Sequence, residues 1–317
     1  EPDMKYGIAI VAAGLFATFG ASASNAADLE AERALGLIVS GSYESWVGAT
    51  FIGEFETDGG GNTPDDDVHF MSGGEARLSF PLGDTLSMQQ DFKYEINSEQ
   101  LTNDDSAAGV DDFYGYHYQA TTHFSFLRDP STGLLGVFGG WGGGYADADE
   151  AMIYFVGGEF QYYAGAWMFQ GQGGYTNGDS DDNGDPEALR DAWFVRGLAR
   201  WYIDADTRLQ IEASYVDGVV DGDEDEAKLY EWGARYDTLV TGLPLVGDTN
   251  VFVRYRGSHA ENRDVSDNGF EEFNDHTFMV GMHWSFGGTT RQEHDRIGVA
   301  LDSPDIARWS LSGEVLD

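Results

Sequence analysis

The 317-residue chain contains no cysteine. Disulfides form in exported proteins, and small secreted domains usually depend on them for stability. The absence of cysteine therefore excludes a small domain held together by disulfides. It is compatible with a large closed sheet, which is held by its own ladder of hydrogen bonds.

Basic residues are scarce, because 17 Lys and Arg stand against 56 Asp and Glu, for a formal net charge of −39. A field of this sign repels nucleic acid and other polyanions and attracts cations. The charge therefore excludes a DNA- or RNA-binding role. Adaptation to a saline habitat is an alternative explanation of the acidity.

Long apolar runs are missing beyond the first residues, which excludes a helical membrane protein. One apolar run, residues 6–19, follows Lys5 and leads to the small residues Ala21-Ser22-Ala23 and Ser24-Asn25-Ala26. This order predicts a secretory signal peptide over residues 1–26, with the residues before Met4 left out of the fold. A membrane-anchoring helix is the alternative, but the run is shorter than the roughly 20 residues needed to cross a bilayer. Residues 27–42 would form a periplasmic lead-in.

The rest of the chain repeats one pattern from residue 43 to residue 286. Segments in which aromatic and aliphatic residues alternate with polar or small ones are separated by polar breaks. Alternation with period two is typical of strands that have two unlike faces, and each segment is long enough for a tilted strand to cross a membrane. About twelve strands are predicted, at 43–55, 68–80, 85–96, 113–127, 133–145, 151–163, 165–176, 190–203, 206–217, 227–238, 248–259 and 275–286.

The breaks between these segments alternate between short and long. Those at 81–84, 128–132 and 204–206 are short, as in tight hairpins, whereas those at 57–67, 98–112, 177–188, 217–226 and 260–275 are longer and polar. Short and long connections therefore fall at opposite ends of the sheet. The pattern predicts a closed, antiparallel, up-and-down transmembrane β-barrel with short periplasmic turns and long acidic outer loops. The breaks at 146–150 and 238–248 fit this rule poorly.

The last segment ends in Met282-His283-Trp284-Ser285-Phe286, with apolar residues at alternate positions. It resembles the terminal-strand signal of the Gram-negative outer-membrane β-barrel superfamily, which includes the porins. The resemblance covers the predicted barrel, residues 43–286. It implies location in the outer membrane, contact with membrane lipid and lipopolysaccharide, and insertion by the barrel-assembly machinery. In that superfamily the closing aromatic residue usually ends the chain, whereas here a tail of residues 287–317 follows.

Charged residues fall on the predicted lumen-facing side of several strands. Walls of opposite charge are one way in which channels select solutes. Alternatively the charges pair with one another and fill a narrow barrel, for example Arg208 with Glu212 or Arg235 with Glu231. The residues predicted to line the pore are Arg196, Arg200, Arg208, Arg235, Arg254, Arg256, Glu75, Asp91, Glu95, Glu159, Glu212 and Glu231.

One outer loop resembles the first half of a calcium-binding loop. Asp179, Asp181, Asn183 and Asp185 supply oxygen atoms at alternate positions, but Arg190 stands where such a loop needs a bidentate Glu. A weak Ca²⁺ site is therefore one interpretation, and a solvated acidic loop is the other.

Histidines favour an enzyme as an alternative function. His69, His117, His259 and His276 lie near the predicted outer mouth, with Asp67, Asp112 and Asp275 close by, as a hydrolase at the outer rim would need. The sequence His123-Phe124-Ser125 resembles a pairing found in outer-membrane phospholipases, but both polar side chains are predicted to face the lumen, whereas a lipase needs them toward lipid. Histidines that are hydrogen-bonded within the fold or exposed to solvent are the other interpretation of all these residues.

The first hypothesis is thus a porin-like channel, without enzymatic activity, for passive diffusion of small hydrophilic solutes or ions. The alternatives are a hydrolase at the outer rim and a sealed barrel that serves as an anchor or adhesin. The tail is assigned to the periplasmic side without a fold of its own. It would hang free, dock on the short turns or enter the lumen.

Overall fold

The computed structural model describes residues 39–52, 56–57, 67–83, 85–97, 115–146, 149–180, 189–220, 225–243, 247–263, 271–287 and 290–310. The predicted signal peptide, most of the lead-in and most of the predicted outer loops lie outside these residues. Among the described residues, no helix is long and apolar enough to cross a membrane.

Twelve long antiparallel strands form one sheet, and each corresponds to one predicted segment. A further strand, β2 (Glu56–Thr57), pairs with the first two residues of the last long strand. The long strands are β1 (Ser40–Ile52), β3 (Asp67–Pro81), β4 (Ser87–Asn97), β5 (Tyr116–Asp129), β6 (Gly133–Ala146), β7 (Asp149–Ala164), β8 (Trp167–Ser180), β9 (Arg190–Tyr202), β10 (Arg208–Val220), β11 (Asp225–Leu243), β12 (Gly247–Arg263) and β13 (Glu271–Phe286).

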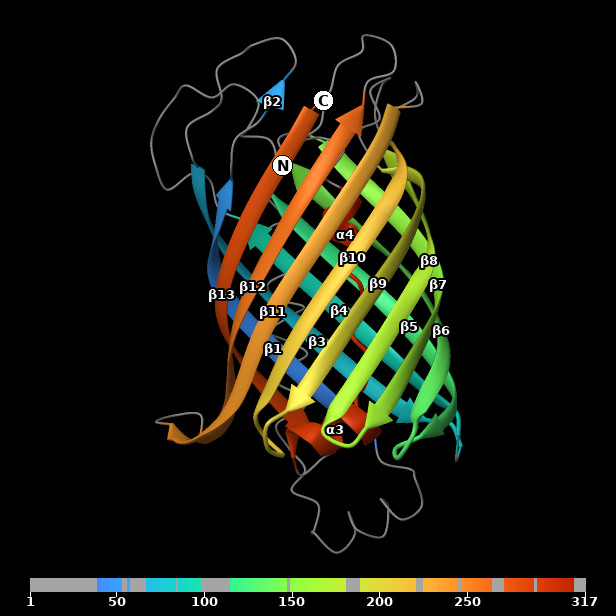
Figure 1. Ribbon diagram of the computed structural model, residues 1–317, viewed down its shortest axis with the longest axis vertical. Helices are drawn as coiled ribbons and strands as arrows, with labels where there is room; N and C mark the ends of the chain where they lie inside the picture. The colour runs from blue at the N-terminus through green and yellow to red at the C-terminus, as the bar shows by residue number, and fades with distance from the viewer. Residues whose placement is uncertain are drawn as a thin grey trace, which may run out of the picture. The chain divides into compact units, whose positions relative to one another are not determined.

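The sheet closes on itself because β1 pairs with β13 as well as with β3. Val47 of β1 lies opposite Val280 of β13 on one side and Ser72 of β3 on the other. Each remaining long strand pairs with its neighbours in sequence, which gives the up-and-down barrel drawn in Figure 1. The predicted fold class is confirmed.

Period-two alternation separates the two faces of the barrel wall. On β13, Phe278 is 55% exposed and Val280 54%, whereas Thr277 and Met279, which alternate with them, are buried in the interior. Large apolar side chains point outward on every long strand that the structure describes, and polar side chains point inward on most of them. An apolar outer belt around a polar interior is the arrangement that a lipid bilayer requires of a β-barrel.

The two irregular connections have a simple explanation. The predicted break at 238–248 belongs mostly to strand, because β11 continues to Leu243 and β12 starts at Gly247. A register shift between Val240 and Leu243, together with a positive φ of 71° at Gly242, accompanies this extension. The break at 146–150 is likewise mostly strand, since only residues 147–148 separate β6 from β7.

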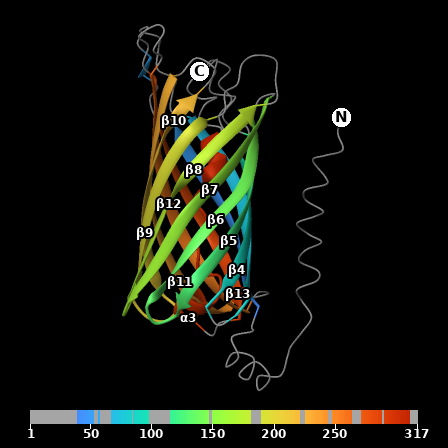
Figure 2. The ribbon, with the colours of Figure 1, turned by 90° about the vertical axis from the view of Figure 1, so that its right-hand side faces the viewer.

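The tail enters the barrel, which is one of the three placements that the sequence left open. Helix α3 (Arg291–Ile297) lies across the end that carries the short turns, and helix α4 (Ile306–Ser310) lies within the barrel in both ribbon views (Figures 1 and 2). Residues 298–305 connect them without regular secondary structure. Residues 299–310 thus lie in the lumen.

Candidate functional site: the lumen and its C-terminal segment

The candidate site is the barrel interior together with residues 290–310, which we call the lumen segment. Thr290 starts α3, because its side-chain oxygen accepts the Glu293 N–H at 3.1 Å in the manner of an N-cap. Asp295 then accepts hydrogen bonds from Arg208 of β10 at 2.5 Å and from Tyr202 of β9 at 2.7 Å. These contacts hold α3 across the end of the barrel that carries the short turns.

His294 of α3 is fully buried, and its Nε2 lies 3.1 Å from the Gly41 carbonyl of β1. Burial and the neighbouring Arg291 guanidinium lower the pKa of His294 from 6.5 to about 4, although Asp295 acts in the opposite direction. Burial tends to raise the pKa of Asp295, but Arg208 and Arg291 outweigh this effect and hold it below its usual value. The docked helix therefore contains a neutral imidazole and an ionised carboxylate.

Asp302 joins the segment to several strands in the middle of the barrel. One of its carboxylate oxygens accepts from Arg77 of β3 at 2.5 Å, and the other accepts from Arg200 of β9 and, at 3.4 Å, from Gln210 of β10. A carboxylate shared by two buried guanidiniums neutralises charges that would be costly to bury alone. Asp302 thereby connects opposite sides of the wall through one side chain.

Glutamine side chains of the wall hold the backbone of the segment. Gln89 of β4 donates to the Leu301 carbonyl at 2.7 Å and accepts from the Leu301 N–H at 3.3 Å. Gln119 of β5 donates to the Pro304 carbonyl at 2.9 Å and accepts from the Ala307 N–H at 3.0 Å. A carboxamide offers both a donor and an acceptor, as a peptide group does.

Three more glutamines extend this contact on β7 and β8. Gln161 donates to the Ala300 carbonyl at 2.7 Å, while Gln170 and Gln172 donate to the Asp302 carbonyl at 3.0 and 2.9 Å. Five wall glutamines therefore satisfy main-chain groups of residues 300–307, a buried stretch that forms no ladder of its own.

A second ionic junction lies three residues further along the segment. Asp305 pairs with Lys93 of β4 and with Arg256 of β12, the latter at 3.2 Å. Arg256 also binds Glu95 of β4 at 2.9 Å, and His117 of β5 lies 3.8 Å from the same Glu95 carboxylate.

Helix α4 packs on an apolar patch of the inner wall. Trp309 and Ile306 are fully buried, and the Trp309 ring lies 5.3 Å from that of Phe194. The end of the helix is polar again, since Arg308 pairs with Glu231 at 2.6 Å and with the fully buried Asp275. The patch consists of Phe138, Ile153, Phe155, Leu189, Ala192, Phe194, Val216, Ala227, Leu229 and Ala260.

A glycine allows α4 to approach the wall. A Cβ atom at Gly142 of β6 would lie 2.9 Å from the Cβ of Ala307 and 2.7 Å from the Tyr118 carbonyl oxygen. Such distances are shorter than real Cβ contacts allow, so a side chain here must displace α4 or the strand.

All twelve residues predicted to line the pore face the interior, where they form ion pairs and hydrogen bonds. The pairs suggested from the sequence do not form. Arg208 binds Asp237 and Asp295, and Arg235 binds Glu44 at 2.7 Å together with Asp237.

The other predicted residues pair across strands or with the lumen segment. Glu212 accepts from Arg196 and, at 2.7 Å, from Arg254, whereas Glu231 pairs with Arg308. Glu75 pairs with Arg77 at 2.5 Å, and His123 lies between Glu159 at 2.9 Å and Asp91 at 3.2 Å. The acidic and basic groups are thus interleaved, and the wall that carries most arginines also carries Glu212, Glu231 and Asp237.

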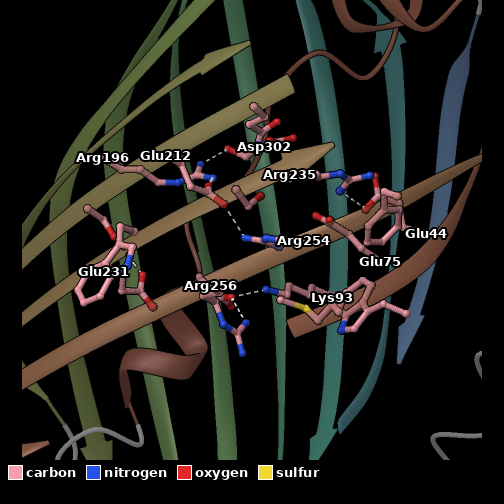
Figure 3. A pocket seen from close by; sticks show the side chains of 18 of the residues that line it. Glu44, Glu75, Lys93, Arg196, Glu212, Glu231, Arg235, Arg254, Arg256 and Asp302 are labelled. Atoms are coloured by element: carbon pink, nitrogen blue, oxygen red, sulfur yellow. Dashed lines mark hydrogen bonds and ion pairs between the residues drawn. The ribbon is translucent and has the colours of Figure 1, made fainter. Parts of the chain in front are cut away.

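A small cavity of about 50 Å³ remains beside the segment, between β1, β3, β4 and β9–β13. Figure 3 shows charged side chains of both signs around it, including Glu44, Arg196, Arg254 and Asp302. A few water molecules fill such a volume. The lumen segment and buried side chains of the wall surround this cavity.

The histidines do not gather into one site. His69 is buried and faces the interior, whereas His276 is on the outer face of β13, with its Nδ1 2.9 Å from the Tyr255 hydroxyl. His259 is also on the outer face, beside Asn274 and Glu261. Asp275 faces inward and is bound by Ser258 and Arg308. The side chains of Asp67 and Asp112 lie outside the described residues.

His123 and Ser125 both face the interior, and a different serine approaches the histidine. Ser303 of the segment has its Oγ 3.0 Å from Nε2 of His123 and donates to Asp91 at 2.7 Å. The hydroxyl hydrogen therefore points to a carboxylate and not to the imidazole that would act as a base. We interpret this cluster as part of the docking contacts.

The residues of the predicted calcium-binding loop lie largely outside the described residues. The side chain of Asp179 and all of Asp181, Asn183 and Asp185 lie outside the described residues. Within the described part of the chain, no group of three or more acidic or histidine side chains is arranged to hold a metal ion.

Sequence reasoning missed the wall glutamines, the inner apolar patch and the acidic residues of the tail. A signal for the patch was present, since Phe138, Phe155 and Phe194 occupy inward positions where a water-filled pore favours polar residues. Large inward apolar side chains need an apolar partner, and the tail contains Ile306 and Trp309.

No protein-family model matches the sequence, and no curated protein matches it either. Solved structures with a similar fold include an outer membrane channel from Pseudomonas putida F1, at 14% identity and a TM-score of 0.47, covering 78% of this chain and 97% of that one. Outer-membrane-expressed OmpT of Vibrio cholerae is 13% identical with a TM-score of 0.36, and the match covers 79% of this chain and 97% of that one. A FadL homologue of Pseudomonas aeruginosa is 9% identical with a TM-score of 0.39, and the match covers 78% of this chain and 90% of that one.

The closed twelve-stranded barrel, its apolar outer belt and its polar interior define the class: the chain has the architecture of a transmembrane β-barrel. The similarity to solved structures is limited to this architecture. What the barrel does has to be argued from its own interior.

Proposed function

We propose that this protein is a channel for small hydrophilic solutes or ions, and that the lumen segment closes it in the conformation described here. One observation carries the proposal: the segment runs through the lumen and is held mainly by hydrogen bonds and ion pairs to the wall. Polar contacts of this kind are replaced by water when the segment leaves, so they favour reversible closure over a permanent core.

The wall supports the same proposal. Without the segment, the interior keeps its charged and carboxamide side chains, which a water-filled pore accommodates and a sealed apolar core does not. Arg77, Arg200 and Arg256 would exchange the carboxylates of Asp302 and Asp305 for water and solute. The opened pore would then have an excess of positive charge at its middle.

The test is conductance of the full-length protein in planar bilayers. We expect rare, brief openings of the native chain, and long openings with permeation of small sugars after Asp302→Asn combined with Asp305→Asn. Asp204→Asn, at an exposed turn, is the matched control and should behave like the native chain. A folded double variant that neither conducts nor admits solutes into liposomes would contradict the proposal and favour a sealed barrel.

A further inference from the structure

We propose that the lumen is a binding site for extended acidic peptides, and that residues 299–307 are its tethered occupant. This inference rests on the proposed function, because a peptide from outside can bind only when the lumen segment has left.

The first argument is how the backbone is recognised. The wall contacts of Leu301, Pro304 and Ala300 are made to main-chain groups, by glutamine side chains from β4, β5 and β7. Such contacts do not depend on which side chains the occupant carries. They give the lumen the property of a strand edge, which binds peptides through their main chain. Small solutes without peptide groups would leave these paired donors and acceptors unused.

The second argument is the spacing of the charges. Asp302 is held by Arg77 and Arg200, and Asp305, three residues later, by Lys93 and Arg256. Two cationic pockets at this separation select peptides with carboxylates at positions i and i+3. Once the segment has left, four buried cations lose a carboxylate partner, so an acidic replacement is favoured over a neutral one.

The third argument is that the lumen segment leaves some space and some hydrogen-bond donors of the wall unused. The cavity of about 50 Å³ borders Asp302 and Asp305. Among the described residues, the Nε atoms of Arg77, Arg254 and Arg256 are buried without a hydrogen-bond partner, and all three side chains line this cavity (Figure 3). The wall therefore offers donors beyond those that its own segment uses, as expected of a site that also accepts other peptides.

The experiment measures binding of a fluorescent peptide with the sequence of residues 298–310 to the full-length protein in detergent. The protein carries Asp302→Asn and Asp305→Asn, which weaken its own segment and leave every wall residue intact. We expect the peptide to bind this variant at least tenfold more tightly than the native chain, whose segment competes. A peptide with Asn at both acidic positions should lose at least tenfold in affinity.

A chemically trapped form provides the control and remains usable if the double variant does not fold. Ser303→Cys puts one thiol on the segment, in a chain that has no other cysteine, at a side chain that contacts His123 and Asp91 when docked. A bulky, water-soluble thiol reagent reaches this thiol only when the segment leaves the wall, and the modified segment cannot dock again. The modified form should therefore bind the peptide at least tenfold more tightly than the unmodified form.

Three results would overturn the inference. They are equal binding to the modified and unmodified Ser303→Cys forms, equal binding of the acidic and the Asn-substituted peptides, and displacement of the peptide by succinate at a concentration no higher than that of unlabelled peptide. The failure is distinguishable from failure of the proposed function. A variant that conducts but binds no peptide overturns only the present inference, whereas a silent variant overturns the channel.

Discussion

At the residue scale, Asp302 is the side chain on which most of the docking contacts converge. Its carboxylate binds Arg77 and Arg200, and its carbonyl accepts from Gln170 and Gln172. Removing one partner from a buried ion pair costs about 3–5 kcal/mol, because the remaining charge stays buried. This position therefore determines how firmly the middle of the segment is held.

We predict that Asp302→Asn alone weakens docking of the segment by about 3 kcal/mol, near the lower end of that range, since the carboxamide keeps the size and some hydrogen bonds of the carboxylate. Protease cleavage within residues 298–310 measures docking, and the variant should be cut much faster than the native chain. The control is Asp204→Asn, because the Asp204 side chain accepts the Asp206 N–H within the same turn. Asp206 itself is not suitable, since its carboxylate accepts from the Arg291 N–H of the segment. Equal cleavage rates would show that Asp302 does not hold the segment.

His294 makes docking sensitive to pH. Because its pKa is about 4 when docked and 6.5 otherwise, the undocked state binds the proton more readily. Docking is therefore firmest above pH 6.5 and weakens as the pH falls toward 4, by up to about 3 kcal/mol. Its charged neighbours, Arg291 and Arg77, oppose protonation, and Asp295 favours it. Another titratable group near His294 is His283, and the centroids of the two rings are 6.0 Å apart.

We predict that channel openings become more frequent as the pH is lowered from 7 to 4.5. His294→Gln, which can still donate to the Gly41 carbonyl, should remove most of this dependence. An unchanged pH profile in the variant would assign the effect to another group.

At the scale of elements, the short helix α4 depends on a strand that makes room for it. Gly142→Val should displace α4, since its Cβ would already overlap Ala307. Gly197→Val is the matched control, because nothing lies within 4 Å of a Cβ built there. Tryptophan fluorescence should report exposure of Trp309 in the first variant only. Unchanged spectra in both variants would contradict the packing described for α4.

The strands could be predicted from the sequence and the path of the tail could not, for one physical reason. A strand such as β13 is exposed to lipid and to the interior at alternate residues, so Phe278, Val280 and Met282 carry a local signal. The contacts of Asp302 and Asp305 join residues about two hundred positions apart. No local pattern encodes them, although the inward charged residues were identified individually.

At the scale of the whole molecule, the apolar belt and the polar interior place opposite demands on neighbouring residues. Val280→Arg puts a charge on the lipid-facing side of the last strand, which costs about 2–4 kcal/mol near the middle of the bilayer. We predict a loss of that size in the free energy of unfolding from lipid vesicles, measured with urea. Val280→Ile is the control and should change little. A tolerated arginine would place Val280 away from lipid.

The central claim is that the lumen segment closes the pore, and trapping the segment outside its docked position tests it within single molecules. The full-length protein carrying Ser303→Cys is inserted into a planar bilayer, and its current is followed before and after addition of a bulky, water-soluble thiol reagent. The native chain, which has no cysteine, is the control. The account predicts rare, brief openings that become long openings once the thiol is modified, and no change in the native chain. A current that stays unchanged after complete modification of the thiol would contradict it.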